Sequence, residues 1–122
     1  MSKRVHFRIG EVKVEAEFNE SLTAKKILAA LPIESVGDYW GGEIYFEIPV
    51  ECPVEKTARE VVEPGTVAYW PEGACLCLFW GPTPASEGSE CRAASKVNLV
   101  GKVLNPDVLR RLRAHRVRVE PA

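Results

Sequence analysis

The sequence lacks any apolar run long enough to span a bilayer, and no apolar segment of the secretory type follows its charged first residues. It also lacks a glycine-rich phosphate loop, a serine-nucleophile elbow and a zinc-protease helix. These absences exclude a membrane-spanning helix and the best-known motifs of phosphate-loop enzymes, serine hydrolases and zinc proteases. We therefore expect a cytoplasmic protein that needs no cofactor and has no membrane among its partners.

The chain also has little net charge, −1 over 122 residues, so bulk charge gives no reason to expect nucleic acid as a partner. The charge is unevenly distributed, because residues 34–90 hold 11 acidic and two basic side chains, whereas the remainder holds six acidic and 14 basic ones. We favour the interpretation that the acidic middle and the basic ends pair across one fold. The alternative is an acidic rim around a site. The arginine-rich stretch 110–118 is expected to be a solvated surface.

The four cysteines have neither the spacing of a zinc site nor the context of a disulfide framework. On a strand, Cys75 and Cys77 would point to the same face, in line with Phe79. A zinc site would need Cys52 and Cys91 to join, with His6 or His115. We therefore predict that Cys75 and Cys77 are core side chains and that no metal is bound. A disulfide between Cys52 and Cys91 is a less favoured alternative.

Alternation of polar and apolar residues predicts most of the strands. Residues 4–9 and 12–18 alternate on either side of a glycine turn and predict a β-hairpin. Residues 21–31 predict a helix that Ser21 or Thr23 can cap and that Pro32 ends. Further strands are expected at 43–48, 66–70, 74–80, 97–103 and 116–120, a second helix at 106–113 and a long polar loop at 81–90.

Residues 74–80 are apolar on both faces and so need cover on both. A barrel with helices packed over its ends would provide that cover. Seven or eight short strands with two helices predict a small β-barrel or sandwich.

Three segments carry a resemblance to a known family. They are Gly37-Asp-Tyr-Trp-Gly-Gly-Glu-Ile-Tyr-Phe46, residues 65–84 (GTVAYWPEGACLCLFWGPTP) and Ala94-Ser-Lys-Val-Asn-Leu-Val-Gly-Lys-Val103. They resemble the small prokaryotic cyclophilin-like proteins, a family whose function is not established, and the resemblance covers almost the whole chain in order. It implies a single domain over residues 1–122. That domain would be mainly β, a closed and mostly antiparallel eight-stranded barrel with two capping helices.

The resemblance also bears on activity, because the family is similar in fold to the peptidyl-prolyl isomerases called cyclophilins. In those enzymes a Phe-His-Arg segment supplies a catalytic arginine. The nearest counterpart here, Tyr45-Phe-Glu-Ile-Pro49, has Glu47 where the arginine is expected. A carboxylate cannot donate a hydrogen bond to the prolyl nitrogen and so cannot weaken the amide resonance. We therefore do not expect the usual isomerase activity.

The candidate site is drawn mainly from aromatic residues in the segments of the resemblance, which would either line a ligand groove or plug the barrel ends. Two carboxylates, Glu43 and Glu47, share one strand face, for which a solvated surface is the favoured interpretation. Arg59 stands among acidic residues, either as an ion-pair hub, which we favour, or as an anchor for a ligand carboxylate. The predicted ligand-binding residues are Tyr39, Trp40, Glu43, Tyr45, Glu47, Arg59, Tyr69, Trp70 and Phe79.

Two classes of function follow from the sequence. We prefer a domain that binds a small molecule or an extended peptide. The alternative is an enzyme, either a divergent prolyl isomerase or a component of an amide-directed hydrolase assembly, since related barrels resemble parts of allophanate-hydrolase and oxoprolinase-type assemblies. No catalytic residue and no oligomeric state is assigned.

Overall fold

The computed structural model describes residues 3–122 and is built mainly from strands. The strands are β1 (Lys3–Ile9), β2 (Val12–Phe18), β3 (Ile33–Tyr39), β4 (Glu43–Glu47), β5 (Arg59–Val62), β6 (Thr66–Trp70), β7 (Cys75–Phe79), β8 (Cys91–Val103) and β9 (Arg116–Pro121). The helices are α1 (Leu22–Ala30) and a 3₁₀ helix, η1 (Pro106–Arg111). Neither helix combines the length and the apolar character needed to cross a membrane.

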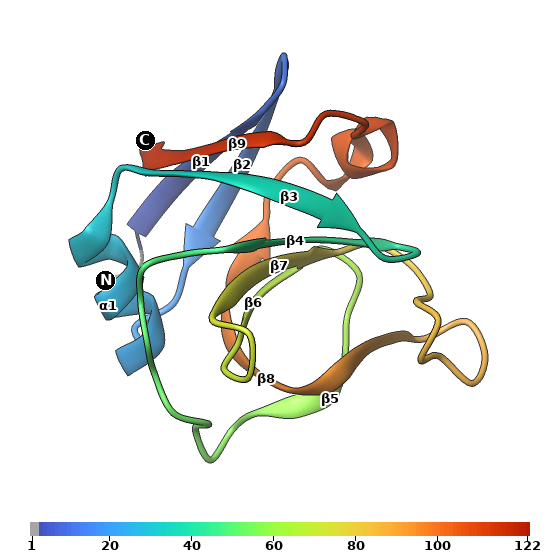
Figure 1. Ribbon diagram of the computed structural model, residues 1–122. Coiled ribbons are helices and arrows are strands. Elements are labelled where there is room, and N and C mark those ends of the chain that lie inside the picture. Colours follow the sequence, from blue (N-terminus) through green and yellow to red (C-terminus); the bar gives the residue numbers. More distant parts are fainter. Residues whose placement is uncertain (1–2) are drawn as a thin grey trace.

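Eight of these strands form a closed ring (Figure 1). The order is β2-β1-β9-β3-β4-β7-β6-β8, and β8 pairs with β2 to complete the ring. Every pairing is antiparallel, and β5 is attached outside the ring, to β8. The predicted fold class, a closed and antiparallel eight-stranded β structure with two helices, is confirmed.

The ring closes through a close approach of two backbones at Gly101. Gly101 of β8 is paired with Phe18 of β2. A Cβ at position 101 would lie 2.2 Å from the carbonyl oxygen of Glu17 and 3.0 Å from the Cα of Phe18. The joint therefore requires glycine, because no side chain fits between the two strands.

The first hairpin and the first helix form as the sequence predicts. β1 and β2 pair in register from Lys3 with Phe18 to Ile9 with Val12. The Ser21 side chain caps α1 by accepting a hydrogen bond from the backbone N–H of Ala24.

A buried polar cluster fixes α1 and the segment before β5 to the middle of β8. Asn98 of β8 is fully buried, and its Nδ2 donates to the Thr23 hydroxyl (3.0 Å) and to the Pro53 carbonyl oxygen (2.9 Å). Its Oδ1 accepts from the backbone N–H of Glu55 (2.8 Å). Every hydrogen-bonding group of this side chain is thus used to hold other parts of the chain together.

Strand β7 is buried on both faces, as its sequence predicts, but helices do not supply the outer cover. Leu76 and Leu78 face the core inside the ring, whereas Cys75, Cys77 and Phe79 face a second apolar cluster outside it. That second cluster is completed by Val62 of β5, Ala68 of β6, and Cys91, Ala93 and Val97 of β8. The outer cover of β7 is therefore β5 and the first half of β8, whereas α1 and η1 pack against the core inside the ring through Ala24, Ile27 and Leu109.

The alternation pattern did not predict three stretches of strand. Residues 33–39 form β3 and residues 59–62 form β5, and neither was among the expected strands. Strand β8 begins at Cys91 rather than at Val97. The expected helix 106–113 is shorter and of the 3₁₀ type. Strand β3, strand β5 and the first half of β8 show little alternation of polar and apolar residues, so the sequence pattern did not predict them.

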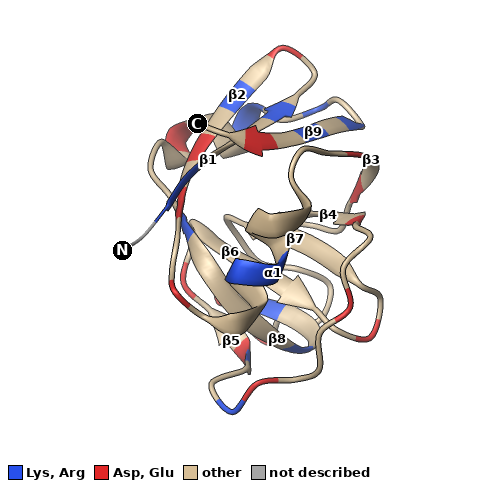
Figure 2. Ribbon diagram, turned by 90° about the vertical axis from the view of Figure 1, so that its left-hand side faces the viewer, with Lys and Arg blue, Asp and Glu red and all other residues tan. Residues whose placement is uncertain are grey.

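The acidic middle of the chain pairs with the basic remainder. Arg118 of β9 contacts Glu34 of β3, and Arg92 of β8 contacts Glu60, Glu87 and Glu90. Figure 2 shows basic residues on β1, β2 and β9, with some acidic residues among them, and acidic residues on β3. These pairs support the favoured interpretation of the uneven charge, that oppositely charged parts of the sequence meet across the fold.

Candidate functional site

A cavity of about 200 Å³ lies outside the ring, between β4, the end of β6 and the first half of β8. We call it the Glu43 cavity. It is lined by Trp40, Glu43, Tyr45, Trp70, Ala93, Ala94 and Val97. Four of the nine predicted ligand-binding residues therefore come together in one place, from three separate elements of the fold.

A tight turn between β3 and β4 positions one wall of the cavity. Trp40 lies in this turn, and its backbone N–H donates to the carbonyl oxygen of Glu43 (2.9 Å). Gly41 has φ +62°, a conformation that favours glycine. The backbone N–H of Gly42 donates to the Pro82 carbonyl oxygen (2.7 Å), so the loop after β7 supports the same turn. Trp40 is thus carried by a backbone that is held from two sides.

The opposite wall is Trp70, the last residue of β6. Its ring lies over Gly73, where a Cβ would come within 2.4 Å of the indole carbons. Its Nε1 donates to the Ser95 hydroxyl (2.6 Å), which in turn donates to the Glu72 carboxylate (2.6 Å). The indole is therefore fixed by packing on one side and by a hydrogen-bond chain on the other.

Glu43 is the one charged residue among the described residues that line this cavity, and it is 5% exposed. Burial raises the pKa of its carboxyl to about 7, and a hydrogen bond from the Cys77 thiol offsets part of that effect. The solvated surface expected for Glu43 and Glu47 is thus wrong for Glu43, because the first half of β8 covers it. Glu47, four residues along β4, is exposed as expected.

The cysteines beside this carboxyl are buried thiols. All four cysteines of the chain are free, and burial raises the pKa of Cys75, Cys77 and Cys91. Cys52 belongs to the core inside the ring, whereas Cys91 belongs to the outer cluster, so the alternative of a disulfide between them is wrong. The prediction that Cys75 and Cys77 pack as core side chains is confirmed. Within residues 3–122 there is no cluster of His, Cys, Asp or Glu that could hold a metal ion.

Three other predicted aromatic residues support the fold rather than the cavity. Tyr69 is 1% exposed inside the ring, and its hydroxyl donates to the carbonyl oxygen of Val50 (2.6 Å). Phe79 is fully buried in the outer cluster. The Tyr39 hydroxyl donates to the Ala114 carbonyl oxygen (2.7 Å) while its ring packs against Trp80. The aromatics of the sequence therefore divide between the two roles that we considered, lining a cavity and filling the barrel.

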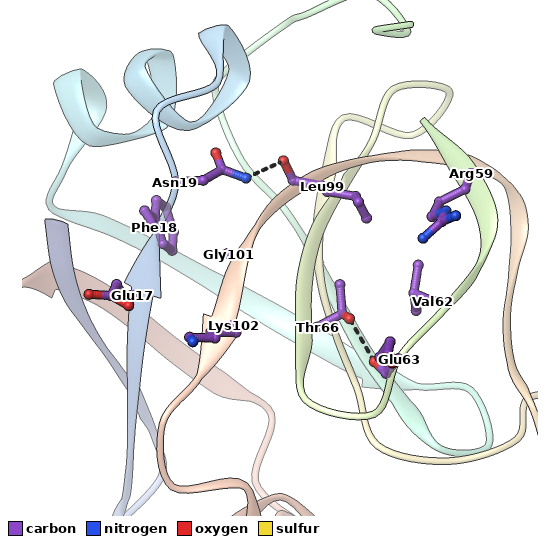
Figure 3. A pocket seen from close by; sticks show the side chains of 10 residues that line it. All are labelled: Glu17, Phe18, Asn19, Arg59, Val62, Glu63, Thr66, Leu99, Gly101 and Lys102. Carbon is purple, nitrogen blue, oxygen red and sulfur yellow. Dashed lines mark hydrogen bonds between the residues drawn. The ribbon is translucent and has the colours of Figure 1, made fainter. Parts of the chain in front are cut away.

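Arg59 lies at a second, larger cavity of about 360 Å³, shown in Figure 3. Lys102 also lines it, together with the acidic Glu17 and Glu63. Among residues 3–122 no ion pair of Arg59 is found, so the favoured interpretation of Arg59 as an ion-pair hub is wrong. Arg92 has that role. The full lining is Glu17, Phe18, Asn19, Arg59, Val62, Glu63, Thr66, Leu99, Gly101 and Lys102.

The Glu43 cavity is the stronger candidate of the two. Arg59, Glu63 and Lys102 are exposed, so water and salt screen their charges, and charges of both signs oppose each other around one opening. In the Glu43 cavity a single carboxyl is buried among three aromatic rings, where water screens its interactions far less. A buried polar group in an apolar hollow is the usual arrangement of a small-molecule site.

The β8 contribution to this cavity was missed by sequence reasoning. Ala93, Ala94 and Val97 line it, and Ser95 holds Trp70. One signal was available, since two adjacent alanines leave space beside larger side chains. Without the knowledge that β8 begins at Cys91, that signal could not be placed next to Trp70.

Comparison with known proteins agrees with the fold and the arrangement of strands. A family model described as cyclophilin-like matches residues 3–120. A hypothetical protein from Archaeoglobus fulgidus, with a known solution structure, is 37% identical and has a TM-score of 0.83. That similarity covers 99% of this chain and 95% of the other.

McbB, solved in complex with tryptophan, has a TM-score of 0.73 at 15% identity, which shows a shared fold alone. The similarity covers 96% of this chain and 44% of McbB. A search of curated proteins found no match. The match to the family model extends over nearly all of the residues that the structure describes, and so the chain belongs to the cyclophilin-like family.

Proposed function

We propose that the protein binds a small organic molecule in the Glu43 cavity. The observation that carries this proposal is the convergence of Trp40, Tyr45 and Trp70 on one buried carboxyl. Aromatic walls provide apolar contact area, and a single polar group fixes the orientation of a ligand.

The size of the cavity favours a small molecule over an extended peptide. With 200 Å³ available and about 30 Å³ for each water, the cavity has room for about seven non-hydrogen atoms. A peptide in extended conformation advances about 3.3 Å per residue and needs a long groove rather than a short hollow. The ligand is therefore expected to be smaller than a drug-sized molecule, for which pockets of about 300–1,000 Å³ are typical.

NMR spectroscopy with a library of small fragments tests the proposal. The chain has three tryptophans, so the indole N–H signals of Trp40 and Trp70 report on the cavity and that of Trp80 serves as an internal reference. We expect a subset of fragments to shift the first two signals and to leave that of Trp80 in place.

The control variant is Ala94→Phe, which places a ring at the exposed edge of the cavity. It should abolish the shifts without changing the rest of the spectrum. Shifts that persist in Ala94→Phe, or a library in which no fragment moves Trp40 and Trp70, would contradict binding in this cavity.

A further inference from the structure

The lining of the Glu43 cavity is unbalanced in charge. Glu43 is 5% exposed and lines the cavity, and the other lining residues, aromatic or aliphatic, include no cation. Glu43 is also hydrogen-bonded to the Cys77 thiol from the neighbouring strand, but a thiol is a weak donor and carries no charge. A carboxylate has room for about four hydrogen bonds, so most of its capacity is available to a ligand.

The aromatic residues also favour a positively charged ligand. Trp40, Tyr45 and Trp70 reach the cavity from the turn before β4, from β4 itself and from the end of β6. The faces of aromatic rings carry negative potential and attract cations, tryptophan most strongly. An anion would be repelled by the carboxylate and would gain nothing from these rings.

We propose that the ligand is a small alkylammonium ion, with its charged nitrogen against Glu43 and its hydrocarbon part between Trp40, Tyr45 and Trp70. This inference rests on the proposed function and specifies the chemical class of the ligand. The cavity has room for such an ion, since n-butylammonium has five non-hydrogen atoms. Removing both ions from water costs free energy, and a direct charge-assisted hydrogen bond from the ammonium to the single carboxyl would offset that cost.

Matched probes test the sign of the ligand charge in the unmodified protein. Titrations at pH 8 with n-butylamine, n-butanol and butyrate, followed by calorimetry and by the Trp40 and Trp70 indole signals, compare a cation, a neutral molecule and an anion of similar size. We expect n-butylamine to bind at least tenfold more tightly than n-butanol, and butyrate most weakly. Equal binding of n-butylamine and n-butanol would overturn the inference.

The variant Glu43→Gln keeps the shape of the side chain and removes its charge. This variant should weaken the affinity for n-butylamine at least tenfold and leave the affinity for n-butanol unchanged. The matched control is Glu47→Gln on the same strand face, which removes an exposed charge outside the cavity and should change neither. If Glu43→Gln and Glu47→Gln lowered the amine affinity equally, a general surface charge effect would replace the proposed contact.

The outcomes separate this inference from the proposed function. Fragments that shift Trp40 and Trp70, combined with no preference for the amine, would leave the binding function in place and overturn the ligand class. An absence of any fragment or probe in the cavity would overturn both. Because n-butylammonium has the same non-hydrogen atoms as a lysine side chain, Nα-acetyl-lysine amide is a further probe. Tighter binding of free n-butylamine than of this amide would indicate a free amine as the ligand. Tighter binding of the amide would indicate a lysine side chain.

Discussion

The Glu43 carboxyl and the Cys77 thiol are neighbours across β4 and β7, and each affects the pKa of the other. Glu43 is paired in register with Phe79 and Tyr45 with Cys77, so the carboxyl and the thiol are diagonal neighbours. The backbone oxygen of Cys75 lies 3.9 Å from the Cys77 sulfur, farther than a strong hydrogen bond allows. Burial raises the pKa of both groups, and for Cys77 the nearby Glu43 adds to the effect. The thiol therefore stays protonated at neutral pH, and the carboxyl titrates there.

This titration predicts a pH-dependent stability. Because the folded protein raises the pKa of Glu43 from 4.5 to about 7, folding favours the protonated form. The stabilisation is fully present below pH 4.5 and is lost as the pH rises through 7. Relative to Glu43→Gln, the free energy of unfolding should fall by roughly 2–3 kcal/mol between pH 5 and pH 8. Urea unfolding of the unmodified protein and of Glu43→Gln at several pH values measures this difference. Parallel pH profiles of the two proteins would contradict a raised pKa of Glu43. Glu47→Gln, at an exposed position, should run parallel to the unmodified protein.

The same titration predicts that amine binding strengthens with pH. Below pH 7 the Glu43 carboxyl must lose its proton before it can pair with an ammonium ion, whereas an alkylamine stays protonated to about pH 10. Cys75 and Cys77, the thiols beside it, remain neutral in this range because their pKa values are raised. The affinity for n-butylamine should therefore rise about tenfold from pH 6 to pH 8. The affinity for n-butanol should not rise. A flat profile for the amine would contradict the assignment of Glu43 as its partner.

We also predict that the protein does not accelerate prolyl isomerisation. The usual reaction needs a donor to the prolyl nitrogen, and at pH 8 the carboxyl of the Glu43 cavity is ionised and can only accept hydrogen bonds. Exchange of a proline-containing peptide, followed by NMR, should keep its uncatalysed time of tens of seconds in the presence of the protein. Faster exchange that Ala94→Phe abolishes would show that the cavity catalyses the reaction after all.

Gly101 gives a prediction about closure of the ring. In Gly101→Ala the added Cβ meets the backbone of Glu17 at 2.2 Å, so β2 and β8 must separate. Overpacking of this kind against backbone should cost about 3 kcal/mol of stability. The matched control is Gly88→Ala in the exposed loop, where the nearest atom is a flexible carboxylate oxygen at 3.5 Å, and its stability should change by less than about 0.5 kcal/mol. Chemical denaturation of the two variants measures the difference, and equal stabilities would show that the joint can relax.

Local patterns predicted the parts of the fold that depend on neighbouring residues. The hairpin of β1 and β2 follows from alternation and a glycine turn, and the cap of α1 from Ser21. Strand β5 was not predicted because three of its four residues are exposed, and its partners lie in β8, far along the chain. A short polar strand of this kind is defined by the strand that it pairs with, which a local pattern does not contain.

The candidate site shows the same limit. Alternation predicted a strand at 43–48, and in the structure Glu43 and Tyr45 on one face of β4 both line the cavity. Tyr69 and Trp70 were both predicted as ligand-binding residues, but adjacent residues of a strand point to opposite faces, and Tyr69 enters the core while Trp70 lines the cavity. Likewise Glu43 and Glu47 are equivalent in the sequence pattern. The first half of β8 covers one of them and leaves the other exposed, and that difference is a property of the tertiary structure.

Strand β8 joins two features that have been described separately. Its second half closes the ring at Gly101, its first half covers the Glu43 cavity, and Asn98 between them is bonded to α1 and to the segment before β5. Occupancy of the cavity and closure of the ring are therefore expected to be thermodynamically linked. A ligand that holds the first half of β8 in place would raise the melting temperature of the whole domain, and a change that loosens the β2–β8 joint would weaken ligand binding at a distance.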